Sequence, residues 1–260
     1  MLGSLLGRIG THSRSAERLA ELLRSSERAV VLTGAGISVP SGIPDFRTPG
    51  KGLWEKVNPM EVAHIDVFRR EPDRFWHFYG NRFASLKDVK PNRAHEVVAE
   101  LERRGLVRAV ITQNIDRLHR AAGSENVVEV HGSIEWCVCP ECGGKVGIDR
   151  VMEMLAGGEG GAPECQACIA PLKPNVVLFG ELLPEQAMSE AHRLASEADL
   201  MIAIGSSLEV YPVASLPQVA CDNGARLALV TQGPTPYDRE AEVKLDGDVV
   251  AELEAVLAAL

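Results

Sequence analysis

Five short apolar runs rich in β-branched residues constrain the fold more than any other feature of this sequence. They cover residues 29–34, 107–112, 126–130, 200–205 and 226–231. Helical patterns separate several of them, for example at 93–105 and 184–198. Because buried strands that alternate with helices form parallel sheets covered on both faces, we predict an α/β protein with a Rossmann-like, doubly wound parallel sheet.

Two stretches interrupt this alternation and set the expected domain organisation. At 260 residues, the chain is long enough for a large domain that carries a small one. We expect the Rossmann-like domain over residues 15–132 and 175–260. Residues 43–90 form a helical and loop insertion that contributes to cofactor binding, and residues 133–174 form a small inserted zinc-ribbon domain.

Composition narrows the class of partner. A net charge of −9 argues against direct nucleic acid binding or attachment to an anionic membrane, since both need a basic patch. No apolar run approaches membrane-spanning length, and the first ten residues are too interrupted for a signal peptide. We therefore expect a cytoplasmic protein whose six cysteines are metal ligands or free thiols.

Ligands of doubly wound sheets bind at the carboxyl ends of the strands, so the residues that follow each run matter most. Gly34, Ala35 and Gly36 follow the first run and allow the backbone to approach a pyrophosphate. Val39 stands where a dinucleotide fingerprint has its third glycine, and the loop runs on to Phe46 and Arg47. This pair offers an apolar face and a cation for phosphate. A tight turn followed by a packed surface loop is the alternative.

The second run ends in a polar cluster of Gln113, Asn114 and Asp116. A carboxamide such as that of nicotinamide needs both a donor and an acceptor, and Asn114 and Asp116 supply them. The alternative is an Asx-type turn that begins the next helix. His131 and Gly132 follow the third run, where the histidine is either a general base or a structural residue.

The cysteines form the most specific local pattern. Cys139 and Cys142 make one C-x-x-C pair, and Cys165 and Cys168 make a second pair after 22 intervening residues. Four thiolates fill a tetrahedron and leave no open position, so this pattern predicts a structural zinc ion. A redox pair is the alternative.

These motifs, in this order, resemble the sirtuins, the NAD-dependent protein-lysine deacylases. The resemblance rests on "GAGIS" with "GIPDFR", "TQNID", "HG", the two cysteine pairs, "NVVLFGE" (175–181) and "GSSLEVYP" (205–212), and it spans residues 25–260. It implies NAD as co-substrate, one structural zinc ion and acylated-lysine proteins or peptides as substrates. The implied reaction transfers the acyl group from lysine to ADP-ribose and releases nicotinamide.

The resemblance also assigns roles to matching positions. His131 is the implied general base, and Asn114 acts with it. The implied NAD-binding residues are Gly34, Ala35, Gly36, Phe46, Arg47, Gln113, Asn114, Ile115, Asp116, Gly205, Ser206 and Ser207. The substrate peptide is expected to lie as an added strand between two segments, with Val177, Phe179 and Gly180 in one and Val210 in the other.

Three positions depart from the family pattern. Thr231 stands where asparagine usually contacts the adenine ribose, and Leu178 replaces a more usual aromatic residue beside the lysine tunnel. Lys173 stands where arginine is common, which we expect to be a surface change.

The acyl group is the least determined feature. Tyr79 and Arg82 are three residues apart, so a helix would place both on one face, where a phenol and a guanidinium can hold a carboxylate. This spacing, with Ala63, resembles sirtuins that remove succinyl or malonyl groups. We expect deacetylation, with the acidic acyl groups and protein ADP-ribosyl transfer as alternatives. A dehydrogenase would need the missing third glycine.

Overall fold

The computed structural model describes residues 14–45, 57–157 and 161–260. Its larger sheet has six strands in the order β3-β2-β1-β7-β8-β9, and all neighbouring pairs are parallel. The strands are β1 (Ala29–Thr33), β2 (Ala109–Thr112), β3 (Val127–Glu129), β7 (Leu200–Ile204), β8 (Arg226–Val230) and β9 (Val243–Leu245). All five predicted runs are strands of this sheet, which confirms the α/β prediction, and the short edge strand β9 is an addition.

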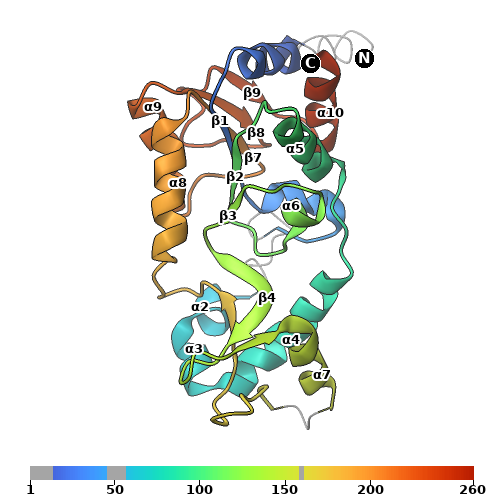
Figure 1. The fold of residues 1–260 in the computed structure, drawn as a ribbon, viewed down its shortest axis with the longest axis vertical. Helices are drawn as coiled ribbons and strands as arrows, with labels where there is room; N and C mark the ends of the chain where they lie inside the picture. Colours follow the sequence, from blue (N-terminus) through green and yellow to red (C-terminus); the bar gives the residue numbers. More distant parts are fainter. Residues whose placement is uncertain (1–13, 46–56, 158–160) are drawn as a thin grey trace.

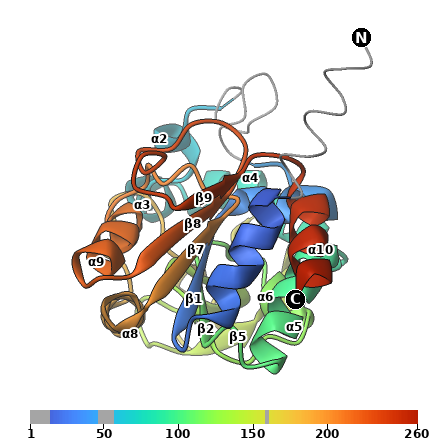
Figure 2. The same ribbon diagram turned by 90° about the horizontal axis from the view of Figure 1, so that it is seen from above.

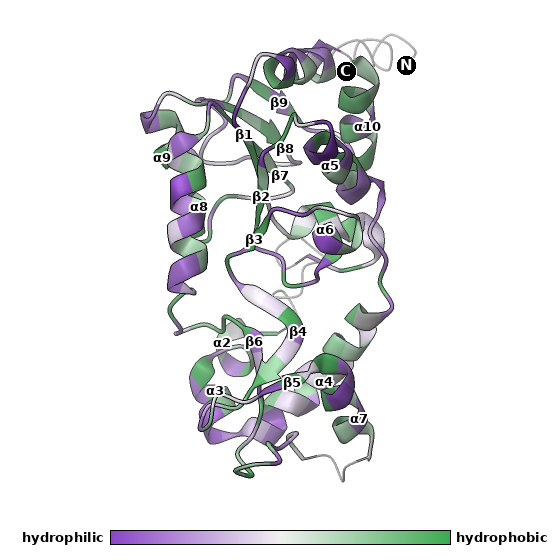
Figure 3. Cartoon of the chain, in the orientation of Figure 1, coloured by the Kyte–Doolittle hydropathy of each residue, from purple (hydrophilic) through white to green (hydrophobic). Residues whose placement is uncertain are grey.

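Alternate residues of the strands enter two separate cores, one on each face of the sheet. Val31, Val110 and Ile202 pack with a helix over residues 14–24, α5 (Arg93–Arg103) and α10 (Val249–Ala259). Leu32, Ile111 and Ala203 pack on the other face with α8 (Glu185–Glu197) and α9 (Leu216–Asp222). Viewed from above, the strands lie between these two helical layers (Figure 2). The central strands β1, β2 and β7 are hydrophobic along most of their length, whereas α5 and α8 carry both polar and hydrophobic residues (Figure 3), as a doubly covered sheet requires.

The strand order reverses at β1. The chain proceeds outward from β1 to β2 and β3, and later returns to β7 on the other side of β1. Such a reversal opens a crevice at the carboxyl ends of the two central strands. β1 and β7 pair in register up to Thr33 and Ile204, so the crevice begins at Gly34 and Gly205.

A smaller module lies at the opposite end of the molecule from α10 (Figure 1). It contains an antiparallel sheet of β5 (Lys145–Gly147), β4 (Gly132–Val138) and β6 (Lys173–Val176), in that order. Its helices are α2 (Pro59–Val62), α3 (Ile65–Arg70), α4 (Pro72–Lys87) and α7 (Ile148–Gly157).

One hydrophobic core joins the two segments that interrupt the strand and helix alternation. Phe68, Phe75 and Trp76 from α3 and α4 pack with Cys137 and Leu172 from the cysteine-containing segment. Trp76 also donates its indole N–H to the Leu172 carbonyl oxygen at 2.9 Å. The helical insertion and the cysteine-containing segment are therefore one packed unit, although they are distant in the sequence.

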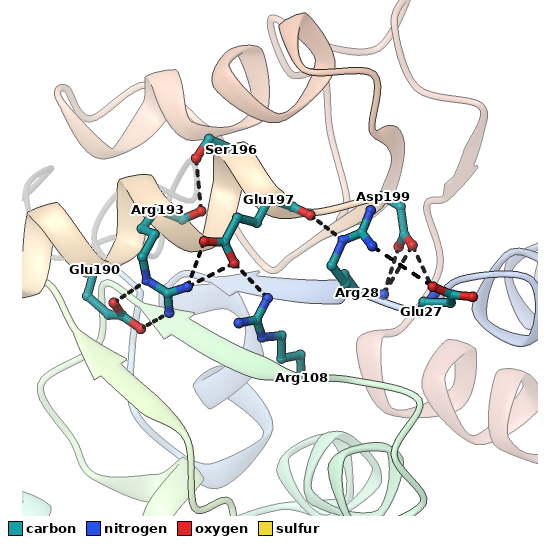
Figure 4. A network of polar contacts seen from close by, with 8 residues as sticks. All are labelled: Glu27, Arg28, Arg108, Glu190, Arg193, Ser196, Glu197 and Asp199. Atoms are coloured by element: carbon teal, nitrogen blue, oxygen red, sulfur yellow. Dashed lines mark hydrogen bonds and ion pairs between the residues drawn. The ribbon is translucent and has the colours of Figure 1, made fainter.

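A network of polar contacts secures the amino-terminal edge of the large sheet (Figure 4). Asp199, which precedes β7, accepts hydrogen bonds from the backbone N–H groups of Glu27 and Arg28 and from the Ser26 hydroxyl. Glu197 binds Arg193 and Arg108, each at 2.8 Å. Because these residues precede β1, β2 and β7, the network holds the starts of three strands together.

None of the helices in the described ranges is long and apolar enough to cross a membrane.

Candidate functional site

Gly34, Gly36 and Gly205 lie together where the carboxyl ends of β1 and β7 adjoin. The Gly36 N–H donates to the Gly205 carbonyl oxygen at 2.8 Å, and a Cβ on Gly36 would lie 2.7 Å from the Gly205 Cα. Gly205 has φ = +61°, and a Cβ there would lie 2.3 Å from the Ile37 nitrogen. No side chain fits at either position. The backbone that follows, a 3₁₀-helix η1 (Ala35–Ser41), thereby packs directly on the end of β7.

The predicted cofactor residues from different strands come together at this edge. The Gln113 side chain donates to the Ser206 hydroxyl at 3.0 Å, across the end of β1. Ser206 is nearly buried and also accepts the Leu208 N–H at 3.2 Å. The segments that follow β2 and β7 therefore form one polar surface beside the Gly34 turn.

Asn114 and Asp116 meet at a buried serine that the sequence analysis did not single out. The Asn114 amide donates to the Gly34 carbonyl oxygen at 3.0 Å and to the Ser38 hydroxyl at 3.1 Å. Ser38 in turn donates to the Asp116 carboxylate at 2.7 Å. Burial raises the pKa of Asp116, although hydrogen bonds from Leu118 and Ser38 oppose that rise.

The structure contains the Asx-type turn that was the alternative for Asp116. Its second carboxylate oxygen accepts the Leu118 N–H at 2.9 Å, at the start of the short helix α6 (Leu118–Ala121). One carboxylate oxygen of Asp116 therefore accepts a hydrogen bond at the start of the helix, and the other oxygen accepts one from Ser38. Both oxygens are thus held in place.

His131 lies between the two sheets, after β3 and before β4. Its Nδ1 lies 2.9 Å from the Gln113 carbonyl oxygen. A carbonyl only accepts, so Nδ1 carries the proton and Nε2 carries the lone pair. Burial lowers the pKa of His131, and the hydrogen bond to Gln113 partly offsets this. The half-buried imidazole is therefore neutral near pH 7 with its basic nitrogen available.

The main chain around His131 is equally constrained. The Val177 N–H donates to the His131 carbonyl oxygen at 2.8 Å. Gly132 has φ = +76°, and a Cβ there would lie 2.2 Å from the Asn175 carbonyl oxygen. The glycine that follows the histidine is thus required by the close passage of β6.

The four predicted zinc ligands converge. The sulfur atoms of Cys139, Cys142, Cys165 and Cys168 all lie within 4.8 Å of one another. The Cys139–Cys168 and Cys142–Cys165 sulfur distances are 3.2 Å and 3.7 Å. A tetrahedral zinc thiolate site has sulfur atoms about 3.8 Å apart, so the arrangement fits this ion. The two other cysteines, Cys137 and Cys221, are free thiols, buried and half-buried respectively.

The two C-x-x-C pairs adopt the same turn. The Gly143 N–H donates to the Cys139 carbonyl oxygen at 2.9 Å, and the Ile169 N–H donates to the Cys165 carbonyl oxygen at 2.8 Å. Gly143 and Ile169 both have positive φ, +71° and +60°. Ile169 in the second turn therefore has the left-handed conformation that Gly143 has in the first turn. Such a conformation is unfavourable for isoleucine, and binding of one shared ion by both turns would account for it.

The family model described as "Sir2 family" matches residues 34–212. The chain belongs to the Sir2 family. It is 48% identical over 230 residues to an NAD-dependent protein deacetylase of Sulfolobus acidocaldarius, covering 88% of each chain. It is 46% identical to an NAD-dependent protein deacetylase of Thermotoga maritima, covering 88% of this chain and 92% of that protein.

Solved Sir2 structures match the fold over nearly the whole chain. A Sir2 mutant with a deacetylated p53 peptide and 3'-O-acetyl ADP-ribose superposes with a TM-score of 0.88 at 44% identity, covering 93% of this chain and 96% of that one. A Sir2 complex with a p53 peptide and NAD+ gives a TM-score of 0.86 at 43% identity, with the same coverage.

In this Sir2-family chain, the segment expected to bind peptide is tied to the helical insertion. The Phe179 N–H donates to the Ala63 carbonyl oxygen, and the Ile65 N–H donates to the Phe179 carbonyl oxygen, both at 2.9 Å. Gly180 has φ = +85°, and a Cβ there would lie 2.6 Å from His64. Val210 lies in the other expected segment, after β7, and its carbonyl oxygen accepts the Ala214 N–H at 2.9 Å.

Two of the departures from the family pattern occupy sites that the sequence did not indicate. Lys173 is half-buried: its ammonium binds Glu181 at 2.9 Å and the Val176 carbonyl oxygen at 2.8 Å. The expectation of a surface change is therefore wrong, because the ion pair joins β6 to the segment of Phe179. Leu178 packs into the core of the smaller module, 4% exposed.

Tyr79 and Arg82 lie on α4, as the helical spacing requires. Tyr79 stacks on Phe75 and Phe83, with ring centroids 4.7 Å and 5.3 Å apart. The Arg82 guanidinium lies 4.8 Å from the Phe78 ring centroid. Burial raises the pKa of Tyr79 to about 12, and the charge of Arg82 acts against that rise, so the two groups interact. Phe46 and Arg47 lie outside the described residues.

The sequence analysis missed a set of buried polar side chains beneath this site. They are at most 3% exposed and comprise Thr33, Ser38, His95, Thr112 and His119. The "PNRAH" segment carried one usable signal, since Asn92 caps α5 and the His95 Nδ1 accepts the Asn92 N–H at 3.3 Å in a capping box. Their convergence depends on how α5 and α6 pack, which periodicity alone does not reveal.

Proposed function

We propose that this Sir2-family chain is an NAD-dependent protein-lysine deacylase with acetyl-lysine as its main substrate. The hydrogen bond from His131 Nδ1 to the Gln113 carbonyl oxygen carries the proposal, because it orients a neutral base at the carboxyl-end edge of the sheet that also carries the glycine turn. The names of the relatives, NAD-dependent protein deacetylase, support the same reaction. So do solved Sir2 complexes with NAD+ and with an acetylated peptide.

The residues present fit NAD as co-substrate. We assign the pyrophosphate to the main chain of the Gly34–Gly36 turn, which packs on Gly205, and a ribose to the polar side chains of Gln113 and Ser206. Asn114 and Asp116 offer the amide and carboxylate that a nicotinamide carboxamide needs. When bound, NAD supplies the nicotinamide leaving group and the ADP-ribose that accepts the acyl group.

His131 then acts as the general base. Its Nε2 accepts a proton from a ribose hydroxyl while Nδ1–H stays on the Gln113 carbonyl oxygen, which stabilises the resulting imidazolium. The peptide is placed by main-chain hydrogen bonds to the Val177–Gly180 and Val210 segments, which makes the site tolerant of sequence. The zinc ion that the four cysteines would hold is structural, since all four positions are taken by protein ligands.

We assign NAD binding to residues 15–132 and 175–260 and zinc binding to residues 133–174, with the helices of residues 43–90 completing the cofactor site. We place the reaction in the cytoplasm, which is supported by six cysteines that are all free of disulfide bonds.

Mass spectrometry of an acetyl-lysine peptide tests the proposal. The wild type and His131→Ala are incubated with the peptide, with and without NAD. NAD-dependent loss of the acetyl group by the wild type alone supports the assignment. Consumption of NAD without loss of the acyl group would contradict it, and a protein mass increased by ADP-ribose would instead identify ADP-ribosyl transfer.

Acidic acyl groups are the second candidate. The positions of Tyr79 and Arg82 on one face of α4, where the charge of Arg82 acts on the pKa of the Tyr79 phenol, favour this candidate, because a phenol and a guanidinium together can hold a carboxylate. A succinyl-lysine peptide in the same experiment distinguishes the two substrates.

A further inference from the structure

A buried chain of three side chains joins the carboxyl ends of β1 and β2. Thr33 ends β1, Thr112 ends β2, and His119 lies in α6. The two threonine hydroxyls are 2.8 Å apart, and the Thr33 hydroxyl lies 3.0 Å from His119 Nε2. All three residues are at most 3% exposed. No step of the proposed reaction uses His119.

The direction of these hydrogen bonds follows from the surroundings of the imidazole. His119 Nδ1 is buried with no hydrogen-bond partner. A buried N–H without an acceptor is costly and rare, so Nδ1 is the bare nitrogen and Nε2 carries the proton. His119 therefore donates to Thr33, and Thr33 donates to Thr112.

The chain ends at the candidate nicotinamide pocket. The Thr112 hydroxyl also accepts the backbone N–H of Asn114 at 3.1 Å. The Asn114 side chain in turn donates to the carbonyl oxygen of Gly34, the residue after Thr33. Asn114 is thus held through its backbone by Thr112 and through its amide by the turn that Thr33 begins.

A second histidine supports the same pocket from α5. The His95 and His119 rings are 5.0 Å apart in an edge-on arrangement. His95 Nε2 lies 3.3 Å from the Ser38 hydroxyl, which binds both Asn114 and Asp116. Burial lowers the pKa of His95 to about 4 and that of His119 to about 3, so both rings are neutral donors throughout the physiological range.

We propose that His119 is a positioning residue for nicotinamide release, which acts by fixing Asn114 through the hydroxyls of Thr33 and Thr112. The inference rests on the proposed function, since it assigns nicotinamide to the pocket of Asn114. It predicts that the Nε2–H donor is what matters at position 119. A glutamine places an amide N–H near the position of imidazole Nε2, whereas leucine fills the volume without a donor.

The test compares His119→Gln with His119→Leu by the exchange of labelled nicotinamide into NAD in the presence of acetyl-peptide. We expect His119→Leu to slow exchange on the order of 100-fold, since small misplacements of a reacting group have this effect. The KM for the peptide should not change. His119→Gln should recover most of the rate, and thermal unfolding midpoints establish that the variants are folded.

Thr33 provides an independent pair of variants. Thr33→Val replaces the hydroxyl by a methyl group of similar size, and Thr33→Ser retains the hydroxyl. Thr33→Val should slow exchange by as much as His119→Leu does. The double variant that combines Thr33→Val with His119→Leu should be no slower than either single variant, because the two residues act as one unit. If His119→Leu does not fold, the Thr33 pair decides alone.

Several outcomes would overturn the inference. Equal impairment of His119→Gln and His119→Leu would show that volume matters and the donor does not. Additive losses in the double variant would show that the two residues act separately. A His119→Leu enzyme as fast as the wild type would exclude positioning while leaving the function intact. Absence of NAD-dependent deacylation in the wild type would instead remove the proposed function.

Discussion

The side chain of His131 is bound to the main chain of Gln113, 2.9 Å away, and both residues follow neighbouring parallel strands. Gln113, which we expect to contact a ribose through its side chain, therefore also fixes the tautomer of His131 through its carbonyl oxygen. Mutation of the Gln113 side chain leaves this contact intact, because the acceptor is a backbone oxygen.

The activity should depend on the protonation of His131. Its pKa lies below the ordinary value of about 6.5, so the base is neutral above that pH and becomes protonated as the pH falls through the lowered pKa. We expect kcat/KM to be flat near neutrality and to fall on the acid side at a midpoint below about 6.5. His131→Ala should lose about 100- to 10,000-fold in rate. An acid limb that persists unchanged in the residual activity of His131→Ala would assign the titration to another group.

The zinc site should hold the smaller module together. Cys165→Ser should abolish binding of one equivalent of zinc and lower the thermal unfolding midpoint, because the knuckle turns lose their shared ligand. Cys221→Ser is the matched control, since Cys221 lies outside the cluster. Metal content by atomic spectroscopy and calorimetric unfolding measure both effects. Full zinc content in Cys165→Ser would contradict the assignment.

Gly205→Ala should damage the NAD site through a clash as well as through backbone strain. Its Cβ would lie 2.3 Å from the Ile37 nitrogen. Gly224→Ala is a matched control because Gly224 also has a positive φ, +88°, but has nothing within 4 Å of a Cβ. The left-handed conformation costs about 1–2 kcal/mol in both variants. We expect loss of NAD binding in calorimetric titration for Gly205→Ala only. Equal losses would remove the clash as the cause.

Asp199→Asn should destabilise the fold, with a defined pH dependence. Burial of Asp199 opposes ionisation, but the hydrogen bonds from Ser26, Glu27 and Arg28 hold its pKa below the ordinary value. Its contribution to stability is therefore present above about pH 4 and is lost as the pH falls through the lower folded pKa.

We expect Asp199→Asn to lose about 1 kcal/mol at pH 7, because a charged acceptor of solvent-exposed hydrogen bonds is replaced by a neutral one. Glu27→Gln should change little, since its side chain is 88% exposed and its ion pair with Arg28 is 3.9 Å long. Urea unfolding at pH 7 and pH 3 measures the difference. A loss for Asp199→Asn that is as large at pH 3 as at pH 7 would contradict the role of its charge.

Arg82→Met tests the acyl preference. If Tyr79 and Arg82 hold an acidic acyl group, loss of the cation should reduce kcat/KM for a succinyl-peptide by about tenfold or more, as for other charge-assisted pairs, and leave the acetyl-peptide unaffected. Arg69→Met is a control on the neighbouring helix α3, where the arginine is 67% exposed. Parallel loss of both activities would assign Arg82 a structural role against Phe78.

The larger sheet could be predicted because its central strands β1, β2 and β7 are buried at every residue and therefore appear in the sequence as continuous apolar runs. β9 was not predicted because it has only three residues and its middle residue, Lys244, is charged. The cysteine cluster could be predicted because two C-x-x-C pairs supply the four thiolates of a tetrahedral zinc site. The common core of Trp76 and Leu172 was not predictable, since 96 residues separate them and no local pattern encodes such packing.

The residues of the candidate site also fall into two groups, those that could be predicted from the sequence and those that could not. Residues that follow strands, such as Asn114 and His131, could be predicted because parallel strands end at one edge. Ser38 and His119 could not, because isolated polar residues on helices carry no signal until tertiary packing brings them together, and the capping box of His95 indicates only the start of a helix. The partly buried position of Lys173 could not be predicted for a related reason, since the chain must turn after β6 to bring its partner Glu181 close.

The positive φ of Gly132 places a change of chain direction next to the base. His131 is held by the end of β2 on one side and by Val177 on the other, and β4 leaves immediately afterward toward the zinc site. His131 therefore lies where the chain passes from the larger sheet into the smaller module. Contacts from both modules converge on this one residue, so a substitution that shifts their common boundary should also shift the imidazole.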